Sequence, residues 1–202
     1  EWARALGFTG VLIGNLGHLP LVRGLDFHLY GDYGLNVFNS RSLAYLKDKE
    51  LESACVSFEL RFAQIRDLKK VLRAEAIVYG RLPLMITENC LVQNETGCRL
   101  DRQGPCVPED GPCRCGQPNV LVDRTGAAFP LLPAYGHRTE IQNSKPLYLA
   151  DRPEHRRLGL AYARLRFTTE TAEECVSVVQ NYLDAAPAAG DFTRGLYERG
   201  VE

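Results

Sequence analysis

Short apolar runs alternate with amphipathic helical segments through the first 80 residues. Residues 10–15 (GVLIGN) form an apolar run bounded by glycines, which is typical of a buried parallel strand. Residues 61–73 carry Ile65, Leu68 and Leu72 on one helical stripe, the pattern of a helix that covers a sheet. The same alternation predicts strands within residues 25–39, 53–58 and 76–79, the last running on towards 84–86, and a helix at 40–48. Repeated strand–helix units of this kind indicate an α/β fold with a parallel sheet.

The last part of the chain continues the pattern after an interruption. Residues 119–132 predict a β-hairpin with a glycine turn, and residues 161–168 predict a further strand. Thr171 and Glu174 have the spacing of a capping box for a helix that buries Ala172, Val176, Val179 and Leu183. About five strands are therefore expected, whereas a closed (β/α) barrel has eight, so we predict a partial TIM-like barrel.

Composition limits the classes of protein to which the chain can belong. Hydrophobic residues make up 45% and charged residues 24%, which is typical of a globular chain, and we predict a single domain over residues 1–202. The net charge of −1 gives no overall attraction to nucleic acid or anionic lipid. No apolar run is long enough to span a bilayer and no signal peptide opens the sequence, so we expect a cytoplasmic protein. Because the sequence begins at Glu1 rather than Met, we expect a fragment that lacks an N-terminal part of its own barrel.

Residues 88–118 break the strand–helix pattern and contain most of the cysteines. This loop is rich in Gly, Pro and Asp, and it holds five of the seven cysteines: Cys90, Cys98, Cys106, Cys113 and Cys115. Their spacing contains no C-x2-C pair, so a structural zinc site fits poorly, whereas an iron–sulfur cluster tolerates irregular spacing of soft donors. The alternatives are reduced thiols without a metal, or disulfides in an exported protein.

Several segments resemble the collagenase-like peptidases of family U-32. The resemblance is carried by YGRLPLMITENCLVQNETGC at residues 79–98, by residues 120–152 and 192–202, and by LNVFNSRS and VSFEL upstream. It covers nearly the whole chain, and it implies a barrel whose N-terminal strands are absent from this sequence.

The resemblance also implies a [4Fe–4S] cluster, with zinc or no metal as alternatives. Cys90 and Cys98 match the first two ligand positions of the family. Cys115 is preferred for the third over Cys113, with Cys106 last. His137 stands in GHRTEI where the family has cysteine. A neutral imidazole can ligate iron, so His137 is a candidate fourth ligand, and one of the extra loop cysteines is the alternative.

Functional side chains of barrels lie at the carboxyl ends of strands. That rule nominates Asn36, Asn39, Glu59, Arg81 and Glu88, with Glu59 and Glu88 as acid/base candidates and Arg81 as a clamp for an anionic group. The structural alternatives are a helix-terminal carboxylate for Glu59 and a salt bridge at the barrel mouth for Arg81.

Other noticeable side chains are expected to be structural. Cys55 and Cys175 are predicted core residues, and a solvated helix face is favoured over RNA contact for the basic residues of one helix. The isolated histidines have no ligand partner at a suitable spacing. The isolated histidines are His18, His28 and His155, and the basic residues of the helix are Arg66, Lys70 and Arg73.

The family name implies proteolysis, yet the sequence has no serine elbow, no zinc-protease helix and no Cys–His pair at a recognisable spacing. Other members of the family hydroxylate RNA bases or quinone precursors with their cluster. We therefore expect an iron–sulfur-dependent modification enzyme acting on RNA or a small aromatic substrate. A collagenase-like protease acting on a peptide and a non-catalytic iron–sulfur scaffold are the alternatives.

Overall fold

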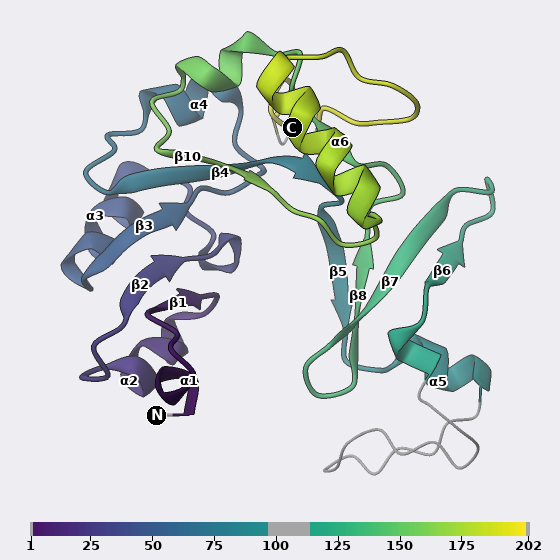
Figure 1. The fold of residues 1–202 in the computed structure, drawn as a ribbon, viewed down its shortest axis with the longest axis horizontal. Coiled ribbons are helices and arrows are strands. Elements are labelled where there is room, and N and C mark those ends of the chain that lie inside the picture. Colours follow the sequence, from purple (N-terminus) through teal and green to yellow (C-terminus); the bar gives the residue numbers. More distant parts are fainter. Residues whose placement is uncertain (1, 97–113, 201–202) are drawn as a thin grey trace.

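A curved sheet of parallel strands forms the centre of the computed structural model, which describes residues 2–96 and 114–200 (Figure 1). The strands follow the order β1-β2-β3-β4-β10, and β9 pairs antiparallel with the end of β4. Their bounds are β1 (Gly10–Ile13), β2 (His28–Gly31), β3 (Leu51–Cys55), β4 (Arg73–Gly80), β9 (Leu147–Tyr148) and β10 (Tyr162–Leu165). The predicted α/β fold with a parallel sheet is therefore confirmed. The described strands form part of a barrel wall without closing it.

Short helices connect the strands. They are α1 (Trp2–Ala5), η1 (Leu16–His18), α2 (Leu19–Val22), η2 (Tyr33–Leu35), α3 (Ser40–Asp48), α4 (Phe62–Asp67), η4 (Pro153–Arg157) and α6 (Ala172–Asp184). The helix predicted at residues 40–48 has those bounds in the structure. It begins there because the Asn39 side chain accepts hydrogen bonds from the backbone N–H groups of Arg41 and Ser42, both at 3.0 Å.

The core lies between the parallel sheet and the helices around it. Leu43 of α3, Ile65 of α4 and Ile77 of β4 are fully buried, and Tyr197 from the C-terminal segment is 1% exposed. Burying a leucine or isoleucine side chain contributes roughly 1.5–3 kcal/mol. The Tyr197 hydroxyl donates to the Ile77 carbonyl at 2.6 Å, so Tyr197 ties the end of the chain to the central strand.

Two predicted elements of the first half have different bounds in the structure. The helix predicted over 61–73 ends at Asp67, because Leu68 takes extended backbone angles and the chain then enters β4. Leu68 and Leu72 still pack in the core, but from a non-helical segment. The β-rich region 25–39 contains one short strand, His28–Gly31, followed by the turn of η2. The strand predicted at 53–58 lies at Leu51–Cys55.

A second, antiparallel sheet projects from one end of the parallel sheet (Figure 1). Its order is β5-β8-β7-β6, with β5 (Pro83–Thr87), β6 (Asn119–Val122), β7 (Ala128–Ala134) and β8 (Arg138–Gln142). The predicted hairpin at 119–132 is confirmed as β6 and β7, while β8 was not predicted. Both outer strands expose consecutive apolar side chains, Leu84–Ile86 on β5 and Val120–Val122 on β6.

The prediction that the fourth strand runs on into residues 84–86 was wrong, since β4 ends at Gly80 and β5 belongs to the other sheet. Gly80 has φ +116°, and a Cβ atom there would lie 2.0 Å from the carbonyl oxygen of Arg166. Only glycine fits this close approach. The chain leaves the parallel sheet at Gly80 and enters the antiparallel sheet at Pro83. Within the predicted loop 88–118, the structure also contains α5 (Leu91–Thr96) and the single turn η3 (Arg114–Gly116).

Helix α6 starts as predicted but turns a different face to the protein. The Thr171 hydroxyl accepts from the Glu174 N–H at 3.2 Å and the Glu174 carboxylate accepts from the Thr171 N–H at 2.8 Å, which confirms the capping box. The predicted buried stripe was wrong, because Val176 and Leu183 are 71% and 70% exposed. The Tyr182 hydroxyl donates to the Val78 carbonyl and accepts from the Leu149 N–H, which turns the Tyr182 side towards the sheet instead.

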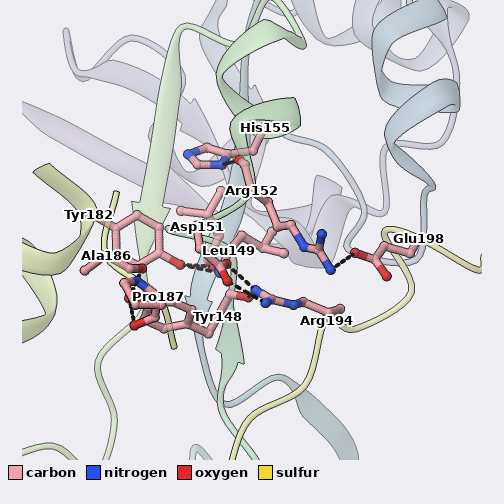
Figure 2. Close-up of polar contacts among 11 residues, drawn as sticks. Tyr148, Leu149, Asp151, Arg152, His155, Tyr182, Ala186, Pro187, Arg194 and Glu198 are labelled. Carbon is pink, nitrogen blue, oxygen red and sulfur yellow. Dashed lines mark hydrogen bonds and ion pairs between the residues drawn. The ribbon is translucent and has the colours of Figure 1, made fainter. Parts of the chain in front are cut away.

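The C-terminal segment is clamped by an ion pair (Figure 2). Both Nη atoms of Arg194 donate hydrogen bonds to the two carboxylate oxygens of Asp151, at 2.6 and 2.7 Å. Nη1 also donates to the Tyr148 carbonyl at 2.6 Å. Asp151 is one quarter exposed, so solvent screens this bidentate pair only partly. The Arg194 guanidinium lowers the pKa of Asp151. A second pair joins Arg152 and Glu198 at 3.1 Å, nearer the surface.

None of the helices in the part of the chain that the structure describes is long and apolar enough to cross a membrane.

The clamp predicts an acid-sensitive contribution to stability. Because the folded pKa of Asp151 lies below its unfolded value of about 3.9, the contribution is present above that pH and is lost as pH falls through the folded value. Asp151→Asn should lower the free energy of unfolding at pH 7 by about 1–3 kcal/mol. Urea unfolding at several pH values measures both effects. Glu198→Gln, on the more exposed pair, should change stability by less than about 1 kcal/mol, and an equal loss would contradict the prediction.

Candidate functional site

Charged side chains gather on the parallel sheet around β10. In most barrels the interior is filled by apolar side chains instead. Arg164 on β10 forms ion pairs with Asp32, which follows β2, and with Glu75 on β4. The three side chains are only 15–21% exposed. Charges this deeply placed are stable only when paired, so the cluster fixes the relative positions of β2, β4 and β10.

Arg166 directly follows β10 and joins the two sheets. Its Nη2 donates to Glu140 at 2.7 Å, and its Nη1 donates to the Gln142 side chain at 2.6 Å and to the Arg81 carbonyl at 2.7 Å. Glu140 and Gln142 both lie on β8 of the antiparallel sheet, and Gln142 is fully buried. These partners belong to β8 and to the residue that follows β4, so Arg166 links the antiparallel sheet to the parallel sheet.

An aromatic ring borders the Arg166 junction. The Arg166 guanidinium lies 5.6 Å from the ring centre of Tyr33, which in turn lies 5.9 Å from the ring of Phe58. Burial is the main cause of a raised pKa of Tyr33, and the nearby Glu140 carboxylate adds to it. Tyr33 therefore stays a neutral hydroxyl near neutral pH and can donate a hydrogen bond.

The predicted cluster ligands that the structure describes lie towards the far end of the antiparallel sheet. Cys90 is 7% exposed and directly precedes α5, while Cys115 is half-buried in η3, a turn that contacts α5. His137 lies in the turn between β7 and β8, with φ +59°. Cys98, Cys106 and Cys113 lie outside the described residues. Within the residues 2–96 and 114–200, no group of three His, Cys, Asp or Glu side chains is placed to hold a metal ion.

The nominated side chains near the strand ends have structural partners. Arg81 donates to the carbonyls of Asn143, at 3.0 Å, and Ser144, so it tethers the β8–β9 connection. Glu88 is 80% exposed and accepts from Arg138 at 3.0 Å, across the β5–β8 pair. The structure does not bring Arg81 and Glu88 together around one site.

The remaining nominees lie close to helix ends. Asn39 caps α3, and Asn36 closes η2 in a left-handed conformation. Glu59 is half-buried in the turn before α4, where its backbone N–H donates to the Ser57 hydroxyl at 3.3 Å. Catalytic roles for Glu59, Arg81 and Glu88 stay predictions.

Cysteine and histidine side chains away from the loop are largely structural, as expected. Cys55 is fully buried, and burial raises the pKa of its thiol to about 12. His155 is buried against the Arg152 carbonyl at 2.5 Å, and His28 pairs with Glu52. Cys175, in contrast to its predicted core position, is only half-buried on α6.

The basic residues of the α4 region are also occupied locally. Arg66 pairs with Asp67 at 2.8 Å and Arg73 with Glu52 at 2.7 Å. Lys70 donates to backbone carbonyls at the end of α4, the closest that of Ile65 at 2.6 Å. Arg66 is exposed on α4 as predicted, whereas Lys70 and Arg73 do not lie on that helix, because α4 ends at Asp67 and Arg73 begins β4.

The charged cluster on the sheet was missed in the sequence. Its members are Asp32, Glu75 and Arg164, and the Arg166–Glu140 pair that joins the two sheets was missed as well. The signal present was Arg164 and Arg166 two residues apart in a predicted strand, since such a spacing places both on one face. The carboxylates that pair with them are up to 132 positions away, and no local pattern reveals that pairing.

The junction predicts a large cost for removing Arg166. Arg166→Met replaces the aliphatic stem of the side chain but leaves Glu140, whose side chain is 14% exposed, without its cation, so the free energy of unfolding should fall by about 3–5 kcal/mol. Arg4→Met is the matched control, because Arg4 and Asp26 form an exposed pair (49% and 84%) worth less than about 1 kcal/mol. Urea unfolding of both variants measures the difference, and similar losses would contradict the junction's role.

The family model described as Peptidase family U32 matches residues 2–121, which include β1 to β5 and all five loop cysteines. Neither the curated proteins nor the solved structures gave a match. The matched segment covers more than half of the 202 residues, and the family resemblance of the sequence is confirmed. The chain belongs to peptidase family U32.

Proposed function

We propose that this member of family U32 is an iron–sulfur-dependent enzyme that modifies an RNA base or a quinone precursor in the cytoplasm. The observation that carries the proposal is the placement of Cys90 and Cys115 on two adjoining elements, α5 with its preceding residue and the turn η3. Two thiols so placed at one end of a sheet are suitable donors for a soft metal centre.

The donor chemistry fits a [4Fe–4S] cluster. Cys90, Cys98 and Cys115 are the proposed thiolate donors, with Cys113 and then Cys106 as alternatives to Cys115, and His137 is the proposed fourth donor, with one of the extra loop cysteines as its alternative. A bound cluster would supply one-electron transfer. The antiparallel ladder between β5 and β8 holds the start of the loop, because Thr87 pairs with Thr139 and Glu88 with Arg138.

At the junction of the two sheets, ion pairs hold the charged side chains in place. The Arg164 and Arg166 guanidiniums are already neutralised by carboxylates, which leaves no strong net charge there. Tyr33 and Phe58 provide half-buried aromatic surface beside them. A neutral or weakly charged aromatic ring suits such a surface better than a polyphosphate. This favours a small aromatic substrate or a single exposed base over a long nucleic-acid footprint.

Proteolysis, which the family name implies, has less support among the described residues. The Cys55 thiol has a pKa of about 12 and is fully buried, so it is a poor nucleophile. His28 and His155 are engaged with Glu52 and with the Arg152 carbonyl, respectively. The further alternative, a scaffold with a structural cluster, would bind iron without changing any substrate.

The proposal is tested by anaerobic purification with iron, sulfide and zinc counted per chain. We expect about four iron and four sulfide per chain in the parent protein. Cys90→Ala should lose most of this iron, while Cys175→Ala, which removes a half-buried thiol on α6, should keep it. A parent protein without iron, or equal iron in both variants, would contradict the cluster.

The same preparations separate the candidate activities. Altered nucleosides in RNA, or hydroxylated quinone precursors, that are lost in Cys90→Ala would support the modification enzyme. Gelatin cleavage that persists after iron is removed would support the protease instead. Full iron content with no change of any of these substrates would support the scaffold.

A further inference from the structure

We infer that Thr139 is the positioning residue of Cys90, an assignment that rests on the proposed function of Cys90 as a cluster ligand. Thr139 is the second residue of β8 and is 3% exposed, while Cys90 is 7% exposed in the loop that follows β5. The Thr139 hydroxyl contacts the backbone on both sides of Cys90.

The two contacts use both capacities of one hydroxyl group. Its proton is donated to the carbonyl oxygen of Asn89 at 3.3 Å, and its lone pair accepts from the N–H of Leu91 at 3.1 Å. Asn89 and Leu91 are the residues immediately before and after Cys90. Holding both neighbours restricts the backbone angles of Cys90, and therefore the direction in which its side chain leaves the loop.

The two backbone groups that Thr139 contacts differ in whether another side chain also forms a hydrogen bond with them. The Asn89 carbonyl also accepts from the Thr87 hydroxyl at 2.6 Å, so that group keeps a donor when Thr139 is changed. The acceptor found for the Leu91 N–H is Thr139. Loss of the hydroxyl therefore acts mainly at the first residue of α5, one position after Cys90.

Strand β8 carries this constraint to the parallel sheet. Thr139 and Glu140 are consecutive residues of β8, and consecutive strand side chains point to opposite faces. Thr139 holds the Cys90 loop on one face, while Glu140 pairs with Arg166 on the other. The Cys90 backbone is thus linked to the parallel sheet through β8 as well as through β5, which precedes it in the chain.

Thiol alkylation of the metal-free protein tests the assignment without depending on the cluster. Thr139→Val replaces the hydroxyl with a methyl group of nearly the same shape, and it should raise the alkylation rate of Cys90 by iodoacetamide about tenfold, as expected for loss of one buried hydrogen bond. Thr139→Ser keeps the hydroxyl and should stay within about twofold of the parent rate. Mass spectrometry of the labelled peptides gives the rate at each cysteine.

Two internal standards separate local positioning from general unfolding. Cys55 is fully buried in the core, so its alkylation must stay slow in every variant if the fold is intact. Thr125→Val is the matched control, because it also removes a threonine hydroxyl, one that donates to Asp123 at 2.7 Å within the β6–β7 turn. Equal Cys90 rates in Thr139→Val and the parent, or in Thr139→Ser and Thr139→Val, would overturn the assignment.

Cluster loading provides a second and separate readout. After anaerobic reconstitution, Thr139→Val should retain several-fold less iron than the parent during dialysis against a chelator, and Thr139→Ser should retain parental levels. If the parent binds no iron, the proposed function fails, while the alkylation rates still decide whether Thr139 positions Cys90. If the parent binds iron and Thr139→Val retains it equally, the assignment fails and the proposed function stands.

Discussion

The arrangement of the two sheets depends on the burial of one guanidinium. Arg166 leaves the end of β10 and is enclosed by Glu140 and Gln142 of β8 and by the Arg81 carbonyl. A buried cation without these partners would cost several kcal/mol, so the antiparallel sheet must lie where β8 can supply them. Gly80 allows this geometry, since the backbone of Arg166 passes too close for any side chain at that position.

Local patterns predicted the elements whose cause is local. Helix α3 begins where Asn39 caps it, the α6 capping box has the predicted partners, and the β6–β7 hairpin has its glycine turn. The exposed face of α6 was mistaken because the apolar stripe of Val176, Val179 and Leu183 is stronger in sequence than Tyr182. The buried side is decided by the Tyr182 hydroxyl, which bonds to backbone groups of β4 and residue 149.

The candidate site divides into a part that its sequence reveals and a part that it does not. The loop cysteines stand out by residue type, His137 was nominated through the family resemblance, and the family match covers those cysteines at residues 90–115. The other residues lie beyond residue 121, namely Thr139, Glu140, Arg164 and Arg166. Their contacts form only because β8 lies beside β5 and β10 lies beside β4. Pairings of this kind come from tertiary packing, which no single-sequence periodicity contains.

The outer strand of the antiparallel sheet has a consequence for the behaviour of the protein at high concentration. Val120, Leu121 and Val122 are 56%, 45% and 58% exposed on β6, and one backbone edge of this strand is unpaired in the described sheet. A bare apolar edge of this kind is a template for intermolecular β-ladders. A lysine in place of Leu121 on β6 would therefore act as a gatekeeper and improve colloidal stability.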